Sequence, residues 1–224
     1  GVYIQSLGNL LGFGELVLGF WGIPFTIFCV VGMINAYNMI DGLNGLCASL
    51  CLVCFLAIIF MINADTVPSL FPLILPVGAI TGFLMYNLGV LGNQRTVFLG
   101  DNGSNALGFM CAWILVYFSS VENSNFIPVT ALWFVTIPFF DAVGVMASRV
   151  IKGIMPLKPG RDHLHHKLLD AGLSSNTIYL VLIFISAVFA VIGYVFNHSF
   201  PTSHYISFYT FIALWVCYYF LTRY

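Results

Sequence analysis

The chain has 224 residues, of which 60% are hydrophobic and only 7% are charged, and its mean hydropathy is +1.00. No water-soluble domain of this size has so apolar a composition, so the sequence predicts a polytopic membrane protein whose first partner is the lipid bilayer. The formal net charge of −1 at pH 7 gives no basic surface for a polyanion, and nucleic acid is excluded as an expected partner.

Runs of about 20 apolar residues, the length that a helix needs to cross a bilayer, recur along the whole chain. They lie at about 17–38, 46–63, 68–88, 104–120, 127–148, 176–196 and 206–222. We therefore expect an all-α protein with about seven transmembrane helices, forming a single membrane-embedded domain over residues 1–224. Pro76 and Pro138 fall inside two of these runs, where we expect kinks.

The basic residues predict how these spans are oriented. The loop 149–175 holds five of the seven Lys and Arg residues of the chain, namely Arg149, Lys152, Lys158, Arg161 and Lys167. Because short loops rich in Lys and Arg stay in the cytoplasm, we place this loop on the cytoplasmic face. Alternating the other spans from it puts Arg95 and Arg223 on the same face, and Asp65 and Glu122 in external loops.

The first polar cluster lies at the end of the run 17–38 and continues just beyond it. Four polar residues recur at every third position, namely Asn35, Asn38, Asp41 and Asn44. Neighbours at this spacing can address one ligand, and Gly42 and Gly45 are expected to end the helix and let the backbone approach it. A carboxylate at membrane depth is costly unless it has a partner or faces water, so Asp41 predicts a functional site. The alternative is an amide-lined helix contact closed by a glycine turn.

The second polar cluster is a glycine-rich turn over 98–109 that leads into the run 104–120. Its carboxylate, Asp101, can hold a hard cation such as Mg²⁺, and free N–H groups at the start of a helix can receive phosphate oxygens. The alternative is that Asp101 or Ser104 only caps the helix.

The third polar cluster contains three of the five histidines, His163, His165 and His166, between Arg161 and Lys167. A zinc site would need Cys or carboxylate partners that this segment lacks, and the three rings cannot all point one way from a regular helix. With the flanking basic residues, the segment is better interpreted as a clamp for an anion. The alternative is an ordinary basic loop beside anionic lipid.

Together these clusters indicate phosphoryl transfer, in which a protein mainly positions anionic groups and neutralises their charge, with a lipid as one substrate. Two other classes stay open: a transporter or channel subunit with an ionisable site at its cytoplasmic face, and a nonenzymatic scaffold. Asp141 follows Pro138 and is expected either to pair with Arg149 or, as we prefer, to belong to the cleft.

Three segments resemble signature motifs of the polyprenyl-phosphate N-acetylhexosamine-1-phosphate transferases. They are Asn35-Ala-Tyr-Asn-Met-Ile-Asp-Gly-Leu-Asn-Gly45, Val97-Phe-Leu-Gly-Asp-Asn-Gly-Ser104 and His163-Leu-His-His166. Their order and spacing agree with the family, as do intervening pieces such as Met85-Tyr-Asn-Leu-Gly89, so the resemblance covers essentially the whole chain. The branch that begins O-antigen and enterobacterial common antigen synthesis is the most similar. The peptidoglycan branch is more distant, since it usually has three consecutive histidines without the interruption at Leu164.

The resemblance implies that undecaprenyl phosphate attacks the β-phosphorus of a UDP-N-acetylhexosamine, expected to be UDP-GlcNAc. UMP is released and a lipid-linked sugar pyrophosphate is formed. It also implies Mg²⁺ as cofactor, with Mn²⁺ as the alternative metal, and a multi-pass enzyme of the bacterial inner membrane whose site faces the cytoplasm. No residue identifies the sugar, and the oligomeric state stays open, with a homodimer as one assembly compatible with the sequence.

Motif position carries residue roles over to this chain. The metal is expected on Asp101, with Asn38 as a second ligand or its close neighbour. The expected catalytic residues are Asp41, Asp101 and His165. The expected substrate contacts are Asn35, Asn44, Arg161, His163 and His166.

Two features depart from the family pattern. Members usually carry Asp at the position of Asn44, so a role that needs a carboxylate there is in doubt. The family also has an Asp-Asp motif before the region matched here, and this sequence contains no adjacent Asp pair. We therefore expect a fragment of a protein with about eleven spans, and we expect a chain without that motif to be catalytically impaired.

Overall fold

The computed structural model describes residues 1–62, 71–92, 96–120, 126–156 and 160–223. The helices in these ranges are α1 (Gly22–Ile40), α2 (Leu46–Met61), α3 (Phe71–Asn87), α4 (Gly100–Ser120), α5 (Thr130–Phe134), α6 (Thr136–Ile151), α7 (Leu164–Asp170), α8 (Ser175–Ser199) and α9 (His204–Thr222). A 3-10 turn over Gly19–Trp21 precedes α1, and the sole extended pairing in the described part is one bridge between Ser6 and Val17. The all-α prediction is confirmed there. Asp65, Arg95, Glu122 and Lys158, used above to orient the spans, lie outside the described residues.

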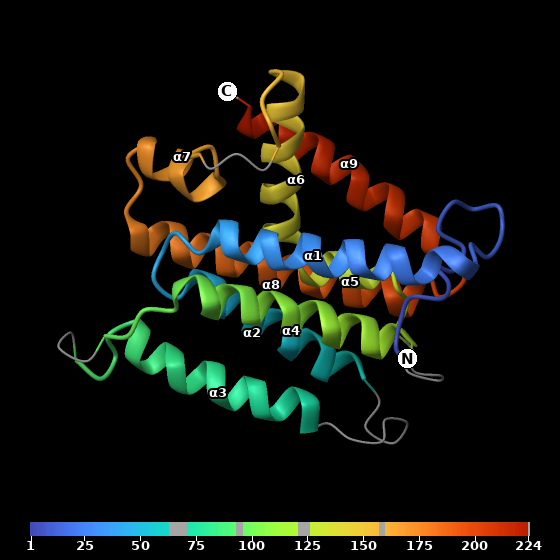
Figure 1. Ribbon diagram of the computed structural model, residues 1–224, viewed down its shortest axis with the longest axis horizontal. Helices are drawn as coiled ribbons and strands as arrows, with labels where there is room; N and C mark the ends of the chain where they lie inside the picture. The colour runs from blue at the N-terminus through green and yellow to red at the C-terminus, as the bar shows by residue number, and fades with distance from the viewer. Residues whose placement is uncertain (63–70, 93–95, 121–125, 157–159, 224) are drawn as a thin grey trace.

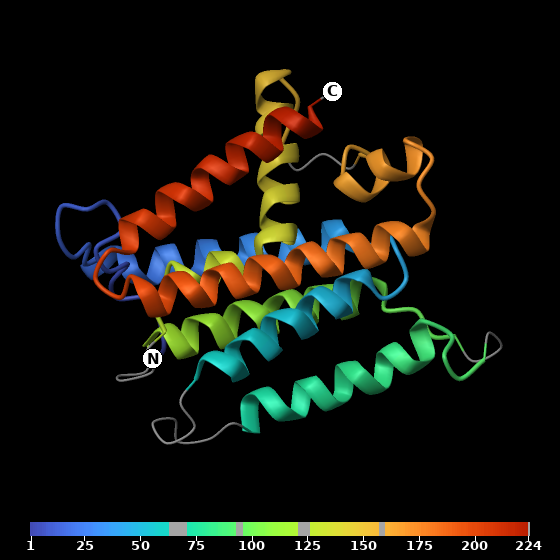
Figure 2. The ribbon, with the colours of Figure 1, turned by 180° about the vertical axis from the view of Figure 1, so that it is seen from behind.

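Helices α1, α2, α3, α4 and α8 lie along the long axis of the molecule, and α3 forms its outer edge (Figures 1 and 2). Among the described helices, α1 and α4 form the most extensive contact. Their approach depends on Gly108 of α4, where a Cβ atom would lie only 2.8 Å from the Cα of Ile34. The tight α1–α4 pair matters for function because each helix carries one of the predicted acidic residues at its end.

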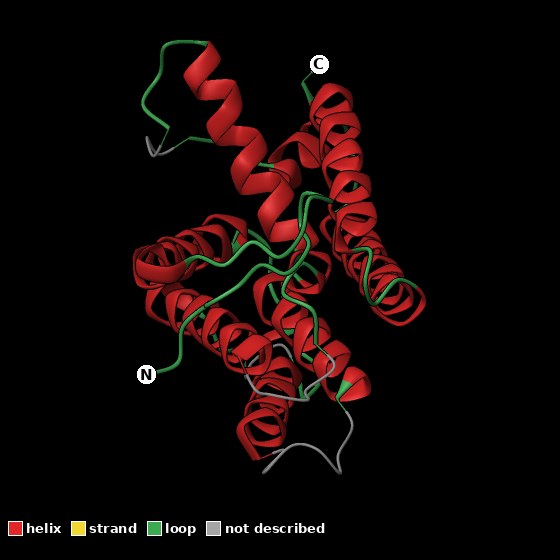
Figure 3. Ribbon diagram, turned by 90° about the vertical axis from the view of Figure 1, so that its right-hand side faces the viewer, coloured by secondary structure: helices red, strands yellow, loops and turns green. Residues whose placement is uncertain are grey.

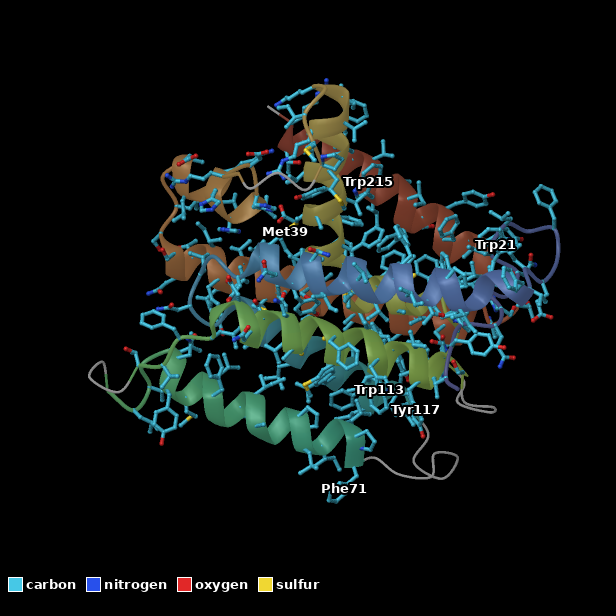
Figure 4. The ribbon with its side chains drawn as sticks, viewed as in Figure 1. Trp21, Met39, Phe71, Trp113, Tyr117 and Trp215 are labelled. Atoms are coloured by element: carbon cyan, nitrogen blue, oxygen red, sulfur yellow. The ribbon has the colours of Figure 1, made fainter. Side chains whose placement is uncertain are left out.

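Three described segments are long and apolar enough to cross a membrane, namely Gly19–Ile40, Ser175–Ser199 and His204–Thr222, and α2 and α3 are apolar but shorter. Large apolar side chains on these segments face outward, with Phe28 74% and Phe184 70% exposed. Such exposure would be unfavourable in water and suits a lipid surround. Trp21 and Phe71, also exposed, lie toward the end of the bundle opposite α7 (Figure 4). The fold is that of a membrane protein, while the number of spans stays a prediction.

The predicted span over 127–148 is not one helix, because the structure divides it at Val135 into α5 and α6, and the kink expected at Pro138 is a full break three residues earlier. In a continuous helix the ring of Pro138 would clash with the carbonyl of Phe134, four residues earlier, and Phe134 is where α5 ends. Placed in the first turn of α6, the same proline needs no N–H partner. Pro76, by contrast, lies inside the continuous α3.

The two halves of this broken helix take different courses. Helix α5 stays in the bundle against α8, whereas α6 leaves it and runs across the other helices (Figures 1 and 3). Buried polar bonds hold α5 in place: the Thr130 hydroxyl donates to Asn197 Oδ1 at 2.9 Å, and Trp133 Nε1 donates to Ser207 Oγ at 2.9 Å. The break therefore projects α6 toward the histidine segment.

Candidate active site

The turn between α1 and α2 presents the first polar cluster. Helix α1 ends at Ile40 and α2 begins at Leu46, so the predicted glycine break is confirmed. Gly45 has φ +76°, and a Cβ atom there would lie 2.5 Å from Leu88 Cδ2. Both its conformation and its surroundings thus favour glycine. The turn carries Asp41, half-buried, and Asn44, exposed, on its surface.

This turn forms one wall of a pocket of about 260 Å³. The segment before α4 and its first turn supply Phe98 and Asp101, and the end of α3 supplies Asn87. The structure therefore brings Asp41 and Asn44 to the same pocket as Asp101, across some sixty positions of sequence.

The two carboxylates of this polar pocket have no side-chain partner in the part of the chain that the structure describes. Within the described ranges, neither the Asp41 nor the Asp101 side chain forms a hydrogen bond or ion pair. Burial raises the pKa of Asp41 to about 6, and the nearby charge of Asp101 adds to the effect. Ser104 does not cap α4, since it lies inside the helix and its hydroxyl donates to the Asp101 carbonyl at 3.1 Å. Two unpaired carboxylates on one pocket favour a bound cation.

The two predicted asparagines of α1 are placed differently from Asp41. Asn38 Nδ2 donates to Ser104 Oγ at 3.0 Å, close to Asp101, while its Oδ1 has no hydrogen bond within the described ranges. Asn35 turns back on its own helix and donates to the Val31 carbonyl at 2.8 Å. Neither residue lines the polar pocket. The metal role of Asn38 and the substrate role of Asn35 stay predictions.

The histidine segment docks on the α1–α2 turn through His165. This side chain is 1% exposed and lies against Gly42, where a Cβ atom would come within 2.0 Å of the His165 Nε2. Burial and the neighbouring His166 lower the pKa of His165 to about 4, so the ring is neutral at pH 7. Both its ring nitrogens are buried without a hydrogen bond to any described group.

The three histidine rings form a row. The rings of His163 and His165 are nearly parallel with centroids 6.1 Å apart, and those of His165 and His166 are 4.2 Å apart. His163 precedes α7 in an extended conformation, with φ −70° and ψ 152°, which lets its ring align with rings on the helix. Arg161 is exposed and forms no hydrogen bond or ion pair within the described ranges. The structure thus unites the histidines and leaves Arg161 at their edge.

The sequence profile of glycosyl transferase family 4 matches residues 1–119, more than half of the chain. This chain belongs to glycosyl transferase family 4. It is 37% identical over 227 residues to the undecaprenyl-phosphate alpha-N-acetylglucosaminyl 1-phosphate transferase of Escherichia coli K12, and the match covers 100% of the chain and 60% of that relative.

Two further enzymes with the same printed name are similar to the chain. The one from Escherichia coli O157:H7 is 39% identical over 202 residues, covering 88% of the chain and 54% of the relative. The one from Haemophilus influenzae is 38% identical over 197 residues, covering 86% of the chain and 55% of the relative. The chain thus spans at most about 60% of the length of these curated relatives.

Two residues of the polar pocket in this family 4 chain lie in segments singled out in the sequence but were not predicted as site residues. Asn87 is 4% exposed and donates through Nδ2 to the Val97 carbonyl at 2.7 Å, but its Oδ1 is buried and unpaired among the described groups. Phe98 lines the pocket beside Asp101. The sequence signal for Asn87 was a single amide residue within the apolar run 68–88.

Asp141 does not pair with Arg149, the first of its two expected roles, and its membership of the cleft stays a prediction. Its carboxylate contacts His163, while Arg149 pairs with Asp162, with Nε and Oδ2 2.9 Å apart. Burial raises the pKa of Asp162, but the hydrogen bond and charge of Arg149 outweigh it and bring that pKa below its ordinary value. The family 4 chain therefore ties its histidine segment to α6 at two points.

A second, apolar cavity of about 370 Å³ lies between α1, α4, α5 and α6. Its lining includes Gly32 and Ala36 of α1, and Phe139 and Met146 of α6. Ala36 precedes Asp41 by five residues, which is roughly 7.5 Å along a helix. The apolar cavity therefore ends close to the polar pocket.

Proposed function

We propose that the complete polypeptide carrying this sequence transfers N-acetylglucosamine 1-phosphate from UDP-GlcNAc to undecaprenyl phosphate. A phosphate oxygen of the acceptor bonds to the β-phosphorus, the bond from that phosphorus to the bridging oxygen breaks, and UMP leaves. One observation carries the proposal: Asp41 and Asp101, whose side chains have no partner among the described residues, meet on one pocket, and His165 packs on Gly42, which lines that pocket. The printed names of the relatives support the same chemistry.

The polar pocket suits the nucleoside of the donor. The face of Phe98 offers a stacking surface for a base, and the unpaired Oδ1 of Asn87 and the amide of Asn44 offer hydrogen bonds to its edge. Asn44 can fill this role without the carboxylate that the family usually carries.

Asp41 and Asp101 would hold Mg²⁺, with Mn²⁺ as the alternative metal. Magnesium is commonly bound by one or two carboxylates together with substrate phosphates and water, which is the donor set that this pocket offers. When bound, the ion would neutralise charge on the pyrophosphate. Asn38 Oδ1 is a further oxygen on the same side of α4.

The histidine row closes the donor site. His165, neutral and packed on Gly42, can give one hydrogen bond to a phosphate oxygen and excludes water from the pocket rim. His166 and Arg161 supply further donors for the pyrophosphate, and His163 Nε2 can accept a hydrogen bond from the sugar. These side chains orient the β-phosphorus rather than form a bond to it.

The apolar cavity would receive the hydrocarbon chain of the acceptor, which places its phosphate near Asp41. The protein then works in the bacterial inner membrane with its polar pocket toward the cytoplasm, where UDP-GlcNAc is present. Its product starts a lipid-linked glycan of the cell envelope, of the O-antigen or enterobacterial common antigen type.

The test uses the complete polypeptide in proteoliposomes containing undecaprenyl phosphate. Radiolabelled UDP-GlcNAc and Mg²⁺ should give label in an organic-extractable lipid together with an equal amount of UMP, and the reaction should run backward with added UMP. The same vesicles are assayed for uptake of sugar and of ions. Uptake without lipid-linked sugar would reject the enzyme in favour of a transporter.

A further inference from the structure

We infer that Asp141 is a positioning residue, which fixes the tautomer of His163 and anchors the start of α7 so that the histidine row faces the polar pocket. The inference rests on the proposed function, because it concerns how the donor of that reaction is held. No motif of the chain includes Asp141, which lies on α6 between the second and third polar clusters.

Both oxygens of the Asp141 carboxylate are used. The residue is 2% exposed, its Oδ2 lies 2.8 Å from His163 Nδ1, and its Oδ1 accepts the backbone N–H of Leu164 at 2.7 Å. A buried carboxylate is stable only when such partners replace water. The second bond takes up an N–H at the first residue of α7, which helices otherwise leave unpaired.

This contact determines which nitrogen of His163 is left for a substrate. A carboxylate accepts hydrogen bonds, so Nδ1 must carry the hydrogen, and Nε2 is the remaining ring atom. Nε2 forms no hydrogen bond within the described ranges. Asp141 thus holds the ring in one orientation with Nε2, which is the hydrogen-bond acceptor of the neutral ring, available to a hydroxyl or N–H group of the nucleotide sugar, without contacting that substrate itself.

The effect of Asp141 extends from α6 to the α1–α2 turn. The ring of His163 lies parallel to that of His165, at 10°, and His165 packs on Gly42 beside Asp41. Tyr218 of α9 packs on Phe140, the residue before Asp141, with ring centroids 5.4 Å apart, so α6 contacts both α7 and α9 near this carboxylate. Releasing it would loosen the row at His163.

The main variant is Asp141→Asn, which has the same shape. Its carbonyl still accepts the Leu164 N–H, but its NH₂ group faces Nδ1 and favours the opposite His163 tautomer. We expect kcat/KM for UDP-GlcNAc to fall about 10- to 100-fold, the usual effect of removing a carboxylate that orients a functional histidine. The change should appear in KM for UDP-GlcNAc, with KM for undecaprenyl phosphate unchanged. Asp170→Asn, the same change at an exposed position of α7, is the matched control and should behave as wild type.

The double variant with His163→Ala separates positioning from general support of the fold. If Asp141 acts through His163, adding Asp141→Asn to His163→Ala should cause no further loss, whereas independent effects would multiply. A second readout does not depend on turnover: diethyl pyrocarbonate should modify buried His165 several-fold faster in Asp141→Asn than in wild type.

The outcomes are distinguishable. If the wild-type protein makes no lipid-linked sugar, the proposed function is wrong. The inference about Asp141 can still be tested, because it predicts faster modification of His165 in Asp141→Asn than in wild type. Active wild type with an unaffected Asp141→Asn variant defeats the inference alone. Multiplying losses also overturn it, as does failure of both Asp141→Asn and Asp141→Glu to accumulate in the membrane, because the carboxylate would then serve only the fold.

Discussion

Two kinds of carboxylate lie beside the histidine row, and they differ in what their oxygens contact. Asp41 is half-buried and has no partner among the described groups, and burial raises its pKa to about 6. Asp141 is almost completely buried, and each of its oxygens accepts a hydrogen bond. Burial alone therefore does not identify a binding residue. The unsatisfied carboxylate at the pocket is the one left for a ligand, while the satisfied carboxylate orders its neighbours.

The largest expected effect comes from an unsatisfied carboxylate. Asp101→Asn keeps the size of the side chain and removes its charge, so formation of lipid-linked sugar should fall by about 10²- to 10³-fold or more. Exchange of labelled UMP into UDP-GlcNAc, measured at saturating Mg²⁺, checks it. An exchange rate equal to that of wild type would show that Asp101 does not bind the metal, although its carboxylate is unpaired among the described residues.

The next largest effect is expected when the histidine row is displaced from the turn that lines the polar pocket. Gly42→Ala would place a Cβ atom on the His165 ring, and a displacement of about 1 Å should cost about 100-fold in kcat/KM for UDP-GlcNAc. Gly82→Ala on α3, where a Cβ atom meets nothing within 4 Å, is the control. Equal activity of Gly42→Ala and Gly82→Ala would show that the reaction does not depend on the position of the histidine row.

A smaller effect is expected at the apolar cavity. Gly32 lines it, and a Cβ atom there meets nothing within 4 Å, so Gly32→Leu fills the cavity without disturbing the helix pair. KM for undecaprenyl phosphate should rise on the order of tenfold, with KM for UDP-GlcNAc unchanged. Gly82→Leu controls for a larger side chain on an outer helix. A rise in both KM values would contradict separate sites for the two substrates.

The smallest effect concerns the second tie between α6 and the histidine segment. Asp162 is 49% exposed at its side chain, so Asp162→Asn should lower the free energy of unfolding by about 1 kcal/mol or less. The folded pKa of Asp162 is depressed, so its contribution is present above the unfolded value of about 3.9 and is lost as the pH falls through the lower folded value. Thermal unfolding in detergent at pH 7 and below pH 4 checks this. A difference from wild type that persists in acid would point to lost packing.

Long apolar runs and glycine spacing were sufficient to predict most helices and the turn that carries Asp41. The break at Val135 was not located, because both halves of the run are apolar and hydropathy cannot tell a straight helix from a broken one. Pro138 gave the signal for a kink, but its direction depends on how α5 is held to α8 and α9. Asn87 was missed for a related reason, since a single amide among apolar residues does not reveal which cavity it faces.

The side-chain partner of Asp141 could not be predicted either, because sequence does not show which residues meet in space. Arg149 follows it by eight residues on the same helix, and His163 by twenty-two, beyond the end of that helix. Sequence separation alone could not choose between them. The choice follows from the course of the chain after α6, which returns His163 to the carboxylate and pairs Arg149 with Asp162.

The course of α6 has a consequence for how the two substrates influence each other. Phe139 and Val143 line the apolar cavity, and Asp141, midway between them, holds His163. Helix α6 thus lines the apolar cavity proposed for the lipid and also positions the histidine row proposed to bind the nucleotide sugar. Because a helix moves as a rigid unit, a shift of α6 caused by one bound substrate would also move the residues that contact the other. Under the proposed function, binding of the lipid and binding of the nucleotide sugar would therefore be coupled through α6.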